Sequence, residues 1–436
     1  MEFSKGMYHV SVKGPVAMVM DKEVTASPQP TITHKYSLWG KNNLWPQDLL
    51  KSLDDVSLVT AVLDWKSRAL YSGGIVYGYA TYDDNGVEIF KPIFDKEIER
   101  WLENTDINRY LIDACTYFYY FYNIFPEIIL SKDKKTITKI YCQETTDVRL
   151  GLMVDGIIST AHLSARWHET VNLEDKTKIK KVPILNIGSN WIEKTKKGTK
   201  RNYILPISYS SPGRHYYQRP PWESLINSSW LDIAKKIPSF KKAILENQIS
   251  VKYLIRVPEW WWESTFPDFK SKDEAQQKKI KNDVHNDFNT FLSGIENAGK
   301  SMMVITKNDF TDTKYAQWEI TAIDNKMKEG MYIEDSQEAD AHIFKNLAVD
   351  PTLFGSGPGK NNESSGSGSD KRVAWNMYIL QQKAIQDLIL KPLNLIARYN
   401  GWTERLSEEN QQGRFEFRFK TSLIATLDAG ETKTNT

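Results

Sequence analysis

A run of glycine and serine between two helical patterns constrains this chain more than any other feature. Residues 355–369 contain five glycines, five serines and almost no apolar side chain, a composition typical of a flexible loop with little to bury. Asp350 and Pro351 end the helical pattern before it, and Asp370 is placed to cap a helix over 371–399 that bends at Pro392. Such a loop inside a chain is uncommon and usually functional; the alternative is a solvated surface linker.

Composition narrows the class of protein. The 436 residues carry 57 Lys and Arg against 55 Asp and Glu, for a net charge of +2. This balance argues against a protein that grips nucleic acid by net charge alone. The two cysteines, Cys115 and Cys142, imply no disulfide framework. Because no signal peptide or 18-residue apolar run is evident, we expect a soluble, intracellular protein with no membrane association.

Helical and strand patterns alternate through the first half of the chain. Apolar residues recur at helical spacing over 45–71 and 96–121. The turn signal at residues 83–86 predicts a hairpin between strands at 75–80 and 87–90. A second hairpin is expected from 126–130 and 136–141, with further short strands at 148–152, 157–161 and 182–187. The aromatic run 117–122 is better explained by core packing than by ligand stacking.

The second half returns to helix and then mixes element types. A helix is expected over 221–248 with a kink at Pro238. It is followed by a strand at 251–257, a charged helix at 272–292, strands at 302–306 and near 318–323, a helix at 325–349, and an amphipathic or edge strand at 414–419. The basic stretches 176–181 and 194–201 indicate solvated turns.

One sequence motif suggests an enzyme. Residues Gly294 to Ser301 match the phosphate-binding pattern G-x-x-x-x-G-K-[ST]. That loop functions when a strand precedes it and a helix follows, so that helix amides point at the phosphates. Here the expected order is reversed, with a helix before and a strand after. A nucleotide-hydrolysing enzyme is therefore kept only as the alternative function.

The sequence contains little else that is typical of a metal site, an enzyme or a ligand-binding site. His162 and His168 lie six residues apart, which fits no helical metal-ligand spacing, so we expect no metal and no cofactor. The cluster Trp260, Trp261 and Trp262 leaves open a carbohydrate-binding function, although no acid pair accompanies it.

Two local patterns resemble the portal (head–tail connector) proteins of tailed bacteriophages. One is Gly294 followed by Asn297-Ala298-Gly299-Lys300 before an apolar strand, which also accounts for the false nucleotide motif. The other is the run 346–355, in which an apolar helix end leads through a proline to Leu353-Phe354-Gly355. The resemblance covers about residues 49–428.

The resemblance implies an α+β portal-like fold with an α/β wing, a two-helix stem, a small α/β clip and a long wing helix. The order implied is an N-terminal arm (1–45), wing (46–220), stem helix (221–248), clip (249–324), second stem helix (325–349), tunnel loop (350–370), long wing helix (371–401), and a wing strand and tail (402–436) with little or no crown. The aromatic cluster 260–262 matches nothing in the family.

The resemblance implies a structural function without catalysis. The chain would form a ring, typically of twelve subunits, at one capsid vertex of a virion, and the virion would be assembled in the host cytoplasm. Double-stranded DNA would be packaged through it by the terminase large subunit and later ejected, with the major capsid protein and head-completion or tail adaptor proteins as further partners. The expected DNA-facing residues are Gly355, Ser356, Gly357, Gly359, Lys360, Asn361, Asn362, Ser364, Gly366, Gly368, Lys371 and Arg372. Stem candidates, with an outward solvated face as the alternative, are Lys235, Lys236, Lys241 and Lys242; clip interface candidates are Trp260, Trp261, Trp262, Lys278 and Lys279.

Overall fold

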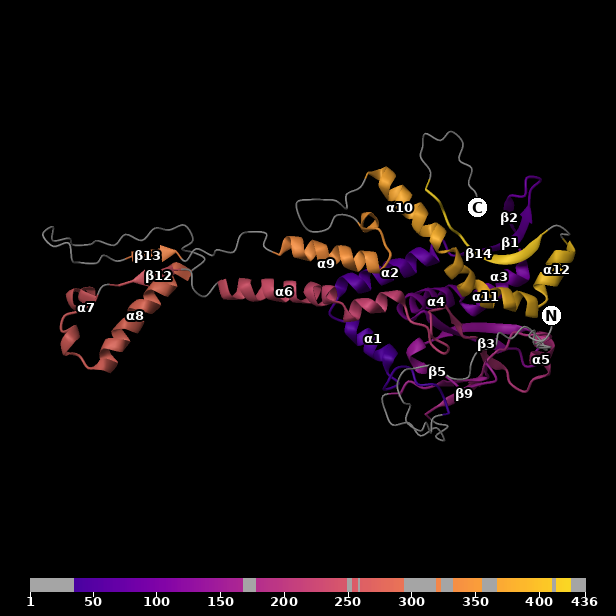
Figure 1. The fold of residues 1–436 in the computed structure, drawn as a ribbon, viewed down its shortest axis with the longest axis horizontal. Coiled ribbons are helices and arrows are strands. Elements are labelled where there is room, and N and C mark those ends of the chain that lie inside the picture. The colour runs from indigo at the N-terminus through magenta and orange to yellow at the C-terminus, as the bar shows by residue number, and fades with distance from the viewer. Residues whose placement is uncertain are drawn as a thin grey trace, which may run out of the picture. The chain divides into compact units, whose positions relative to one another are not determined.

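The computed structural model describes residues 35–167, 178–248, 253–257, 259–293, 319–322, 332–354, 367–409 and 413–424 (Figure 1). Contacts divide the chain into two units. Unit 1 comprises Met1–Lys236 and Tyr332–Thr436, and unit 2 is the inserted stretch Ile237–Met331. The two halves of unit 1 are therefore brought together in space although about 95 residues separate them in the sequence.

Unit 1 mixes helices with small antiparallel sheets. Its first part contains α1 (Trp45–Leu53), α2 (Ser57–Tyr71), β1 (Ile75–Tyr82), β2 (Glu88–Pro92), α3 (Lys96–Thr105), α4 (Ile107–Phe121), β3 (Asn123–Leu130), β4 (Ile137–Gln143), η1 (Thr145–Asp147), β5 (Val148–Leu150), β6 (Met153–Val154), β7 (Ile157–Ile158), β8 (Thr160–Leu163), β9 (Lys180–Pro183), α5 (Trp191–Lys197), β10 (Asn202–Ile204), β11 (Ile207–Ser208) and η2 (Pro221–Asn227). After the insertion come α9 (Ile333–Asn346), η5 (Pro351–Leu353), α10 (Gly368–Gln381), α11 (Lys383–Tyr399), α12 (Trp402–Glu409) and β14 (Arg414–Phe419).

The core of unit 1 lies where helices from both halves of the chain meet. Val59 of α2, Leu111 of α4 and Ile389 of α11 are fully buried in one apolar cluster, together with Ile124 of β3. Ile124, Ile128 and Leu130 of β3 contribute to the same cluster, as the two-residue period of a strand requires. Ile137 and Ile140 of its partner β4 also contribute, three positions apart because the register shifts between Ile129 and Leu130 of β3. The aromatic run that ends α4 buries Phe118, Tyr119 and Phe121, which confirms core packing.

The three strands β14, β1 and β2 form one sheet in that order. Both predicted hairpins in the first half are confirmed, and the strand predicted at 414–419 lies at the edge of this sheet as expected. Gly86 adopts a φ of 76° in the first hairpin turn, a conformation that glycine reaches without a steric cost. The second half of the chain thus completes a sheet that the first half begins.

A smaller cluster in unit 1 holds residues 35–44 against the sheet β5-β8-β9. Tyr36 forms an isolated bridge with Gly151, and Trp39 stacks on Tyr217 with 4.1 Å between ring centroids. The guanidinium of Arg149 is fully buried beside Trp39. The described end of the predicted N-terminal arm is therefore part of unit 1; residues 1–34 lie outside the described residues.

Two helices that were predicted to be continuous are each broken into two shorter helices. The helix expected over 45–71 is broken between α1 and α2, and the helix over 96–121 is broken at Asp106. Asp106 has a φ of 49°, and its backbone N–H donates to the carbonyls of Leu102 and Glu103. Aspartate tolerates this left-handed conformation better than most residues, so it ends one helix without a glycine or proline signal.

The long wing helix is also two helices rather than one. The break lies at Gln382, between α10 and α11, whereas Pro392 lies inside α11. The expected first stem helix begins as the 3-10 segment η2 and becomes α-helical only from Ser229, after which α6 (Ser229–Gln248) continues through Pro238. α12 was not predicted.

Unit 2 contains β12 (Tyr253–Arg256), α7 (Glu259–Thr265), η3 (Phe269–Ser271), α8 (Glu274–Ser293) and β13 (Glu319–Ala322). β12 and β13 pair antiparallel, which confirms strands at these two positions. The strand expected at 302–306 and the first part of the helix expected over 325–349 lie outside the described residues.

Candidate functional site

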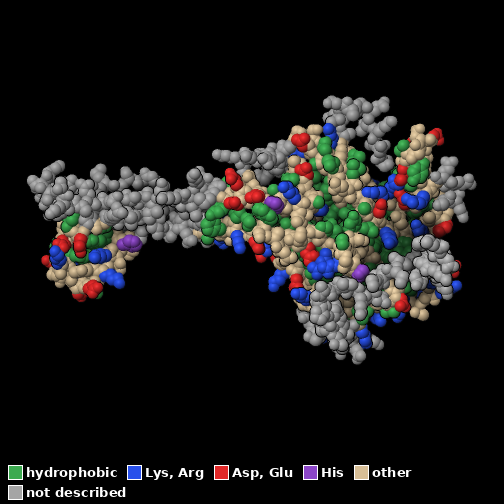
Figure 2. Space-filling view, viewed as in Figure 1, with side chains coloured by type: hydrophobic (Ala, Val, Ile, Leu, Met, Phe, Trp, Pro, Cys, Tyr) green, Lys and Arg blue, Asp and Glu red, His purple; other side chains and the backbone are tan. Residues whose placement is uncertain are grey.

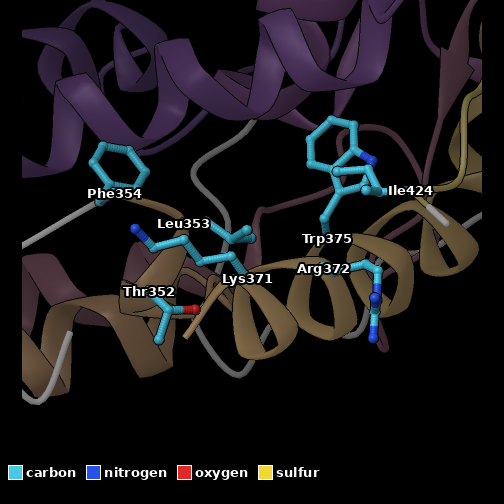
Figure 3. Close-up of a pocket in the computed structure, with 8 residues that line it drawn as sticks. Thr352, Leu353, Phe354, Lys371, Arg372, Trp375 and Ile424 are labelled. Carbon is cyan, nitrogen blue, oxygen red and sulfur yellow. The ribbon is translucent and has the colours of Figure 1, made fainter. Parts of the chain in front are cut away.

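The two described flanks of the Gly/Ser segment meet in unit 1. Residues 355–366 lie outside the described residues, but Phe354 before them and Gly368 after them line the same hollow of about 420 Å³ (Figure 3). The hollow is lined by Thr352, Leu353, Phe354, Gly368, Lys371, Arg372, Trp375 and Ile424. The segment therefore leaves and re-enters the fold at one place.

Both flanks are fixed by local capping. The carboxylate of Asp350 accepts the backbone N–H of Thr352 at 2.9 Å at the start of η5. Ser367, not the predicted Asp370, is the N-cap of α10, and Asp370 is the third residue of the helix. The hydroxyl of Ser367 accepts the N–H of Asp370 at 3.3 Å, while the Asp370 carboxylate accepts the N–H of Ser367 at 2.9 Å. This capping box occurs because Ser367 supplies an oxygen three residues before a carboxylate.

An aromatic cluster ties the flanks to the core. Phe354 contacts Phe344 of α9 and Trp65 of α2, with ring centroids 5.4 and 5.5 Å apart. Trp65 also contacts Tyr378 and Trp375 of α10 at 4.9 and 6.4 Å. One tryptophan of α2 therefore joins the two flanks of the Gly/Ser segment.

Two expected DNA-facing cations lie beside this cluster. Lys371 is exposed and Arg372 half-buried, and Arg372 donates to the hydroxyl of Ser369 at 3.4 Å. In Figure 3 the two side chains point in different directions, Lys371 toward Phe354 and Arg372 away from it. Gly368 belongs to α10, whereas the remaining expected loop residues, Gly355 to Gly366, lie outside the described residues.

A buried lysine that sequence reasoning missed lies where α9 ends. Lys66 of α2 is 8% exposed, and its Nζ donates to the carbonyl of Leu347 at 2.7 Å. A cation at a helix C-terminus satisfies a free carbonyl and interacts favourably with the helix dipole. The ammonium also lies 4.8 Å from the centre of the Tyr119 ring. The available signal was its position on the apolar face of α2, one turn from Val62 and Leu63.

Tyr119, whose ring faces this lysine, is hydrogen-bonded to the break in the long helix. The hydroxyl of Tyr119 donates to the side chain of Gln382, and its oxygen lies 3.3 Å from the hydroxyl of Tyr378. The amide of Gln382 in turn donates to the backbone carbonyl of Tyr378 at 3.1 Å. All three side chains are buried, so the polar groups at the break are satisfied inside the core.

Because Lys66 is buried, we expect it to make the free energy of unfolding depend on pH. Desolvation lowers the pKa of its ammonium from 10.5 to about 8. Between these values the unfolded chain binds the proton more tightly than the folded chain, so the free energy of unfolding rises with pH in this window. We expect wild type to gain about 2 kcal/mol between pH 7 and 9.5 relative to Lys66→Met. Urea unfolding of both proteins across this range measures the difference, and parallel pH profiles would contradict it.

The stem candidates divide between the two units. Lys235 is half-buried, and its Nζ donates to the carbonyl of Ser52 at 3.2 Å, so it braces α6 against the end of α1. Lys236 is exposed in unit 1; in unit 2, Lys241 is half-buried and Lys242 exposed. Lys235 therefore makes a packing contact within unit 1, and the role of the four lysines in a stem stays a prediction.

The unit 1 end of α6 lies beside α9. The Trp230 ring stacks on His342 with centroids 4.1 Å apart and planes 9° from parallel. The side-chain amide of Asn346 donates to the hydroxyl of Ser224 at 3.2 Å just before α6. The helix that leads into the insertion and the helix that follows it are therefore neighbours in unit 1.

The tryptophan cluster belongs to the packing of unit 2. Trp260, Trp261 and Trp262 lie on α7 and are all half-buried. The ring of Trp262 contacts Phe266 and Phe269 with centroids 6.2 and 5.9 Å apart. Lys278 and Lys279 are exposed on α8. No exposed tryptophan platform for a sugar is present among these three residues; their role in an interface stays a prediction.

The nucleotide motif Gly294–Ser301 lies outside the described residues, but what precedes it is described. α8 runs to Ser293, so a helix end rather than a strand leads into the motif. Within the described residues, no group of three or more His, Cys, Asp or Glu side chains is placed to hold a metal ion, and none of the helices is long and apolar enough to cross a membrane. Cys115 is buried, and burial raises the pKa of its thiol.

Comparison with solved structures identifies the fold. The chain is similar to one in the neck of a native gene transfer agent (GTA) particle computed with C12 symmetry, with a TM-score of 0.53 and 12% identity over 89% of this chain and 87% of that one. A chain in the neck of an empty GTA particle computed with C6 symmetry gives 0.51 and 12% over 88% and 85%. One in the virion of the native GTA particle gives 0.51 and 11% over 87% and 84%. No family model and no curated protein sequence matches the chain.

These matches show a fold shared with neck chains of phage-like particles. At 11 to 12% identity they carry no residue-level information. They agree with the expected α+β class, because the described residues mix long helices with antiparallel sheets.

Proposed function

We propose that this chain is the subunit of a portal, a ring at one capsid vertex through which double-stranded DNA enters and later leaves a phage-like virion. The observation that carries the proposal is the fold match to chains of a particle neck, which extends over 84% or more of both chains. A neck joins the head to the tail, so the matched fold supports a structural role at that junction. The C12 symmetry of one matched neck is compatible with a ring of twelve copies.

The order of elements supports the same assignment. α6 leads from unit 1 into the inserted unit 2, α9 follows the insertion, and the Gly/Ser segment comes next, before α10 and α11. This is the order stem, clip, stem, tunnel loop and wing helix. We assign α6 and α9 to the stem, unit 2 to the clip, and residues 355–366 to the tunnel loop.

The charges of the chain fit a channel that lets DNA pass. A duplex carries one negative charge per about 1.7 Å, so a strongly basic lining would hold it in place. The chain has a net charge of only +2, and the described flanks of the loop offer Lys371 and Arg372 beside the acidic Asp370. A chain that supplies a passive channel needs a separate motor, and the proposed partners are therefore the terminase large subunit, the major capsid protein and the head-completion or adaptor proteins.

Native mass spectrometry with negative-stain microscopy tests the proposal. We expect rings with a central hole of roughly 20–40 Å, wide enough for a duplex whose grooves are about 12 and 6 Å wide. The mass of the ring gives the number of copies. Because a subunit of this kind can remain unassembled without its capsid partners, a monomer is tested again after coexpression with them. A monomer under both conditions, and above all one stabilised by nucleotide, would contradict the proposal.

A further inference from the structure

The outer face of α10 exposes apolar side chains that no part of unit 1 covers among the described residues. Val373, Met377 and Leu380 are 50 to 67% exposed. Their spacing of four and three residues places them on one side of the helix. The other side carries Tyr378 and Ile379, which are buried in the core. A helix that is apolar on two sides is typical of one that has a second partner.

The segment after β14 enlarges this face. Asn376 of α10 donates its amide to the carbonyl of Ile424 at 3.1 Å and accepts the N–H of Ile424 at 2.9 Å. Leu423 and Ile424 are themselves at least half exposed. We call the five residues Val373, Met377, Leu380, Leu423 and Ile424 the α10 patch. Figure 2 shows hydrophobic side chains at the surface in this region.

A second apolar surface lies on the hairpin of β1 and β2. Tyr82, Val87 and Ile89 are 40 to 70% exposed. Tyr82 pairs with Glu88 and Ile89 pairs with Thr81, so the apolar side chains lie on both faces of the hairpin. We call these three residues with Asp83 and Asp84 the hairpin tip. In Figure 1 this hairpin projects beyond the rest of its sheet.

Hydrogen bonds within the turn fix the backbone of the hairpin tip. One carboxylate oxygen of Asp83 accepts the N–H groups of Asn85 and Val87 at 2.9 and 2.8 Å. Below the tip, Glu88 forms an ion pair with Arg418, whose guanidinium lies 4.7 Å from the centre of the Phe90 ring. A fixed projection with apolar side chains is preorganised for binding, which lowers the entropy lost on association.

The two surfaces carry opposite charges. Asp83 and Asp84 lie at the hairpin tip, and Glu88 next to it is already paired. Lys371 and Arg372 line the hollow beside Ile424, at one edge of the α10 patch, and they outnumber the nearby Asp370, whose carboxylate lies in the capping box. The hairpin tip therefore matches the α10 patch in charge, while each surface would repel a second copy of itself.

We propose that the hairpin tip of one copy docks on the α10 patch of the next copy. Such a contact joins two different surfaces of the same chain, so it is heterologous and builds a ring when the rotation between copies closes. It covers both exposed apolar surfaces in every member of the ring. The inference rests on the proposed function because it takes the ring as given and assigns the contact that joins its members.

Paired cysteines test the contact in the assembled protein. The double variant Val87→Cys with Met377→Cys is treated with a short bismaleimide after ring assembly and run on a denaturing gel. We expect a ladder of covalent multimers from the double variant and monomer from either single variant, which also controls for Cys115 and Cys142. Rings in the microscope without a ladder would overturn the docking while leaving the proposed function in place. If no rings form under any condition, both fail.

A charge swap gives an independent readout. Asp84→Lys should raise the protomer concentration needed for half assembly at least fivefold at low salt, because it places a cation opposite Lys371. Adding Lys371→Glu should restore assembly. Asp55→Lys, at an exposed aspartate between α1 and α2, is the matched control and should leave assembly unchanged. Equal effects of Asp84→Lys and Asp55→Lys, or no rescue, would contradict the assignment.

Discussion

Replacing residues 355–366 with the linker Gly-Ser-Gly-Ser is expected to leave rings intact and to lower packaged DNA at least tenfold. Phe354 and Gly368 line one hollow, and Trp65 contacts both Phe354 and Trp375 of α10, so we expect a short linker to join the flanks without moving them. Twelve residues reach at most about 40 Å and four about 13 Å. With the replacement the segment is therefore too short to extend into the proposed channel, while both flanks keep their places in the fold. Ser367 is retained because it caps α10.

The measurement is nuclease-protected DNA per particle, in a genetic background that supplies the capsid and motor proteins. A shuffled version of residues 355–366, with the same length and composition, is the control and should package normally if reach rather than sequence matters. Rings that no longer form with the short linker would show that the segment is an assembly element. Normal packaging with the short linker would remove the segment from the DNA path.

The sequence predicted elements best where the signal is local. The turn at residues 83–86 fixed one hairpin, and the alternating pattern at 414–419 indicated β14. Helix breaks were missed where the residue that ends the helix carries no such signal. At Gln382, where the long helix breaks, the side chain accepts a hydrogen bond from Tyr119 of α4, which is 263 positions away in the sequence. Local propensity contains no information about such contacts.

The residues of the candidate site also divide into those that have a local sequence signal and those that have none. The Gly/Ser segment and its flanking cations were evident from composition, whereas Lys66 was not, because its partner Leu347 is 281 positions away. The α10 patch was also missed, since apolar residues on a predicted helix indicate burial unless the fold shows which side is covered. The order of the elements was the part of the portal-like prediction that the sequence alone could support, and the division into wing, stem, clip and tunnel loop stays a prediction.

The largest expected loss of stability comes from Arg149→Met. The guanidinium is fully buried and donates to oxygens of neutral groups: Asn43 Oδ1 at 2.7 Å, and the carbonyls of Asn43, Val148 and Thr146 at 2.6, 2.8 and 2.9 Å. The rings of Trp39 and Trp167 lie 5.6 and 5.1 Å from its central carbon. Burial lowers its pKa to about 10, so it is charged at neutral pH.

Methionine fills part of the same space but donates no hydrogen bond. The substitution removes all four hydrogen bonds. Asn43 Oδ1 and the Thr146 carbonyl keep other donors, the N–H of Trp39 and the side-chain amide of Gln47. A buried acceptor that is left without any donor costs about 1–3 kcal/mol. We expect a net loss of about 3–5 kcal/mol in the free energy of unfolding. Residues 35–44 should also become more sensitive to protease, because the bonds from Arg149 to Asn43 are lost while the backbone bond from Ser37 to Leu150 of β5 remains.

Arg201→Met is the matched control. Arg201 is exposed and also donates to a carbonyl, that of Leu130, at 3.0 and 3.2 Å. Water can replace these bonds, so the control should lose less than about 1 kcal/mol. Urea unfolding followed by circular dichroism compares the two variants, and limited proteolysis reports on residues 35–44. Equal losses in both would mean that the buried network adds no more stability than a surface hydrogen bond, and that the packing of Trp39 and the backbone bond from Ser37 to Leu150 hold this segment on its sheet.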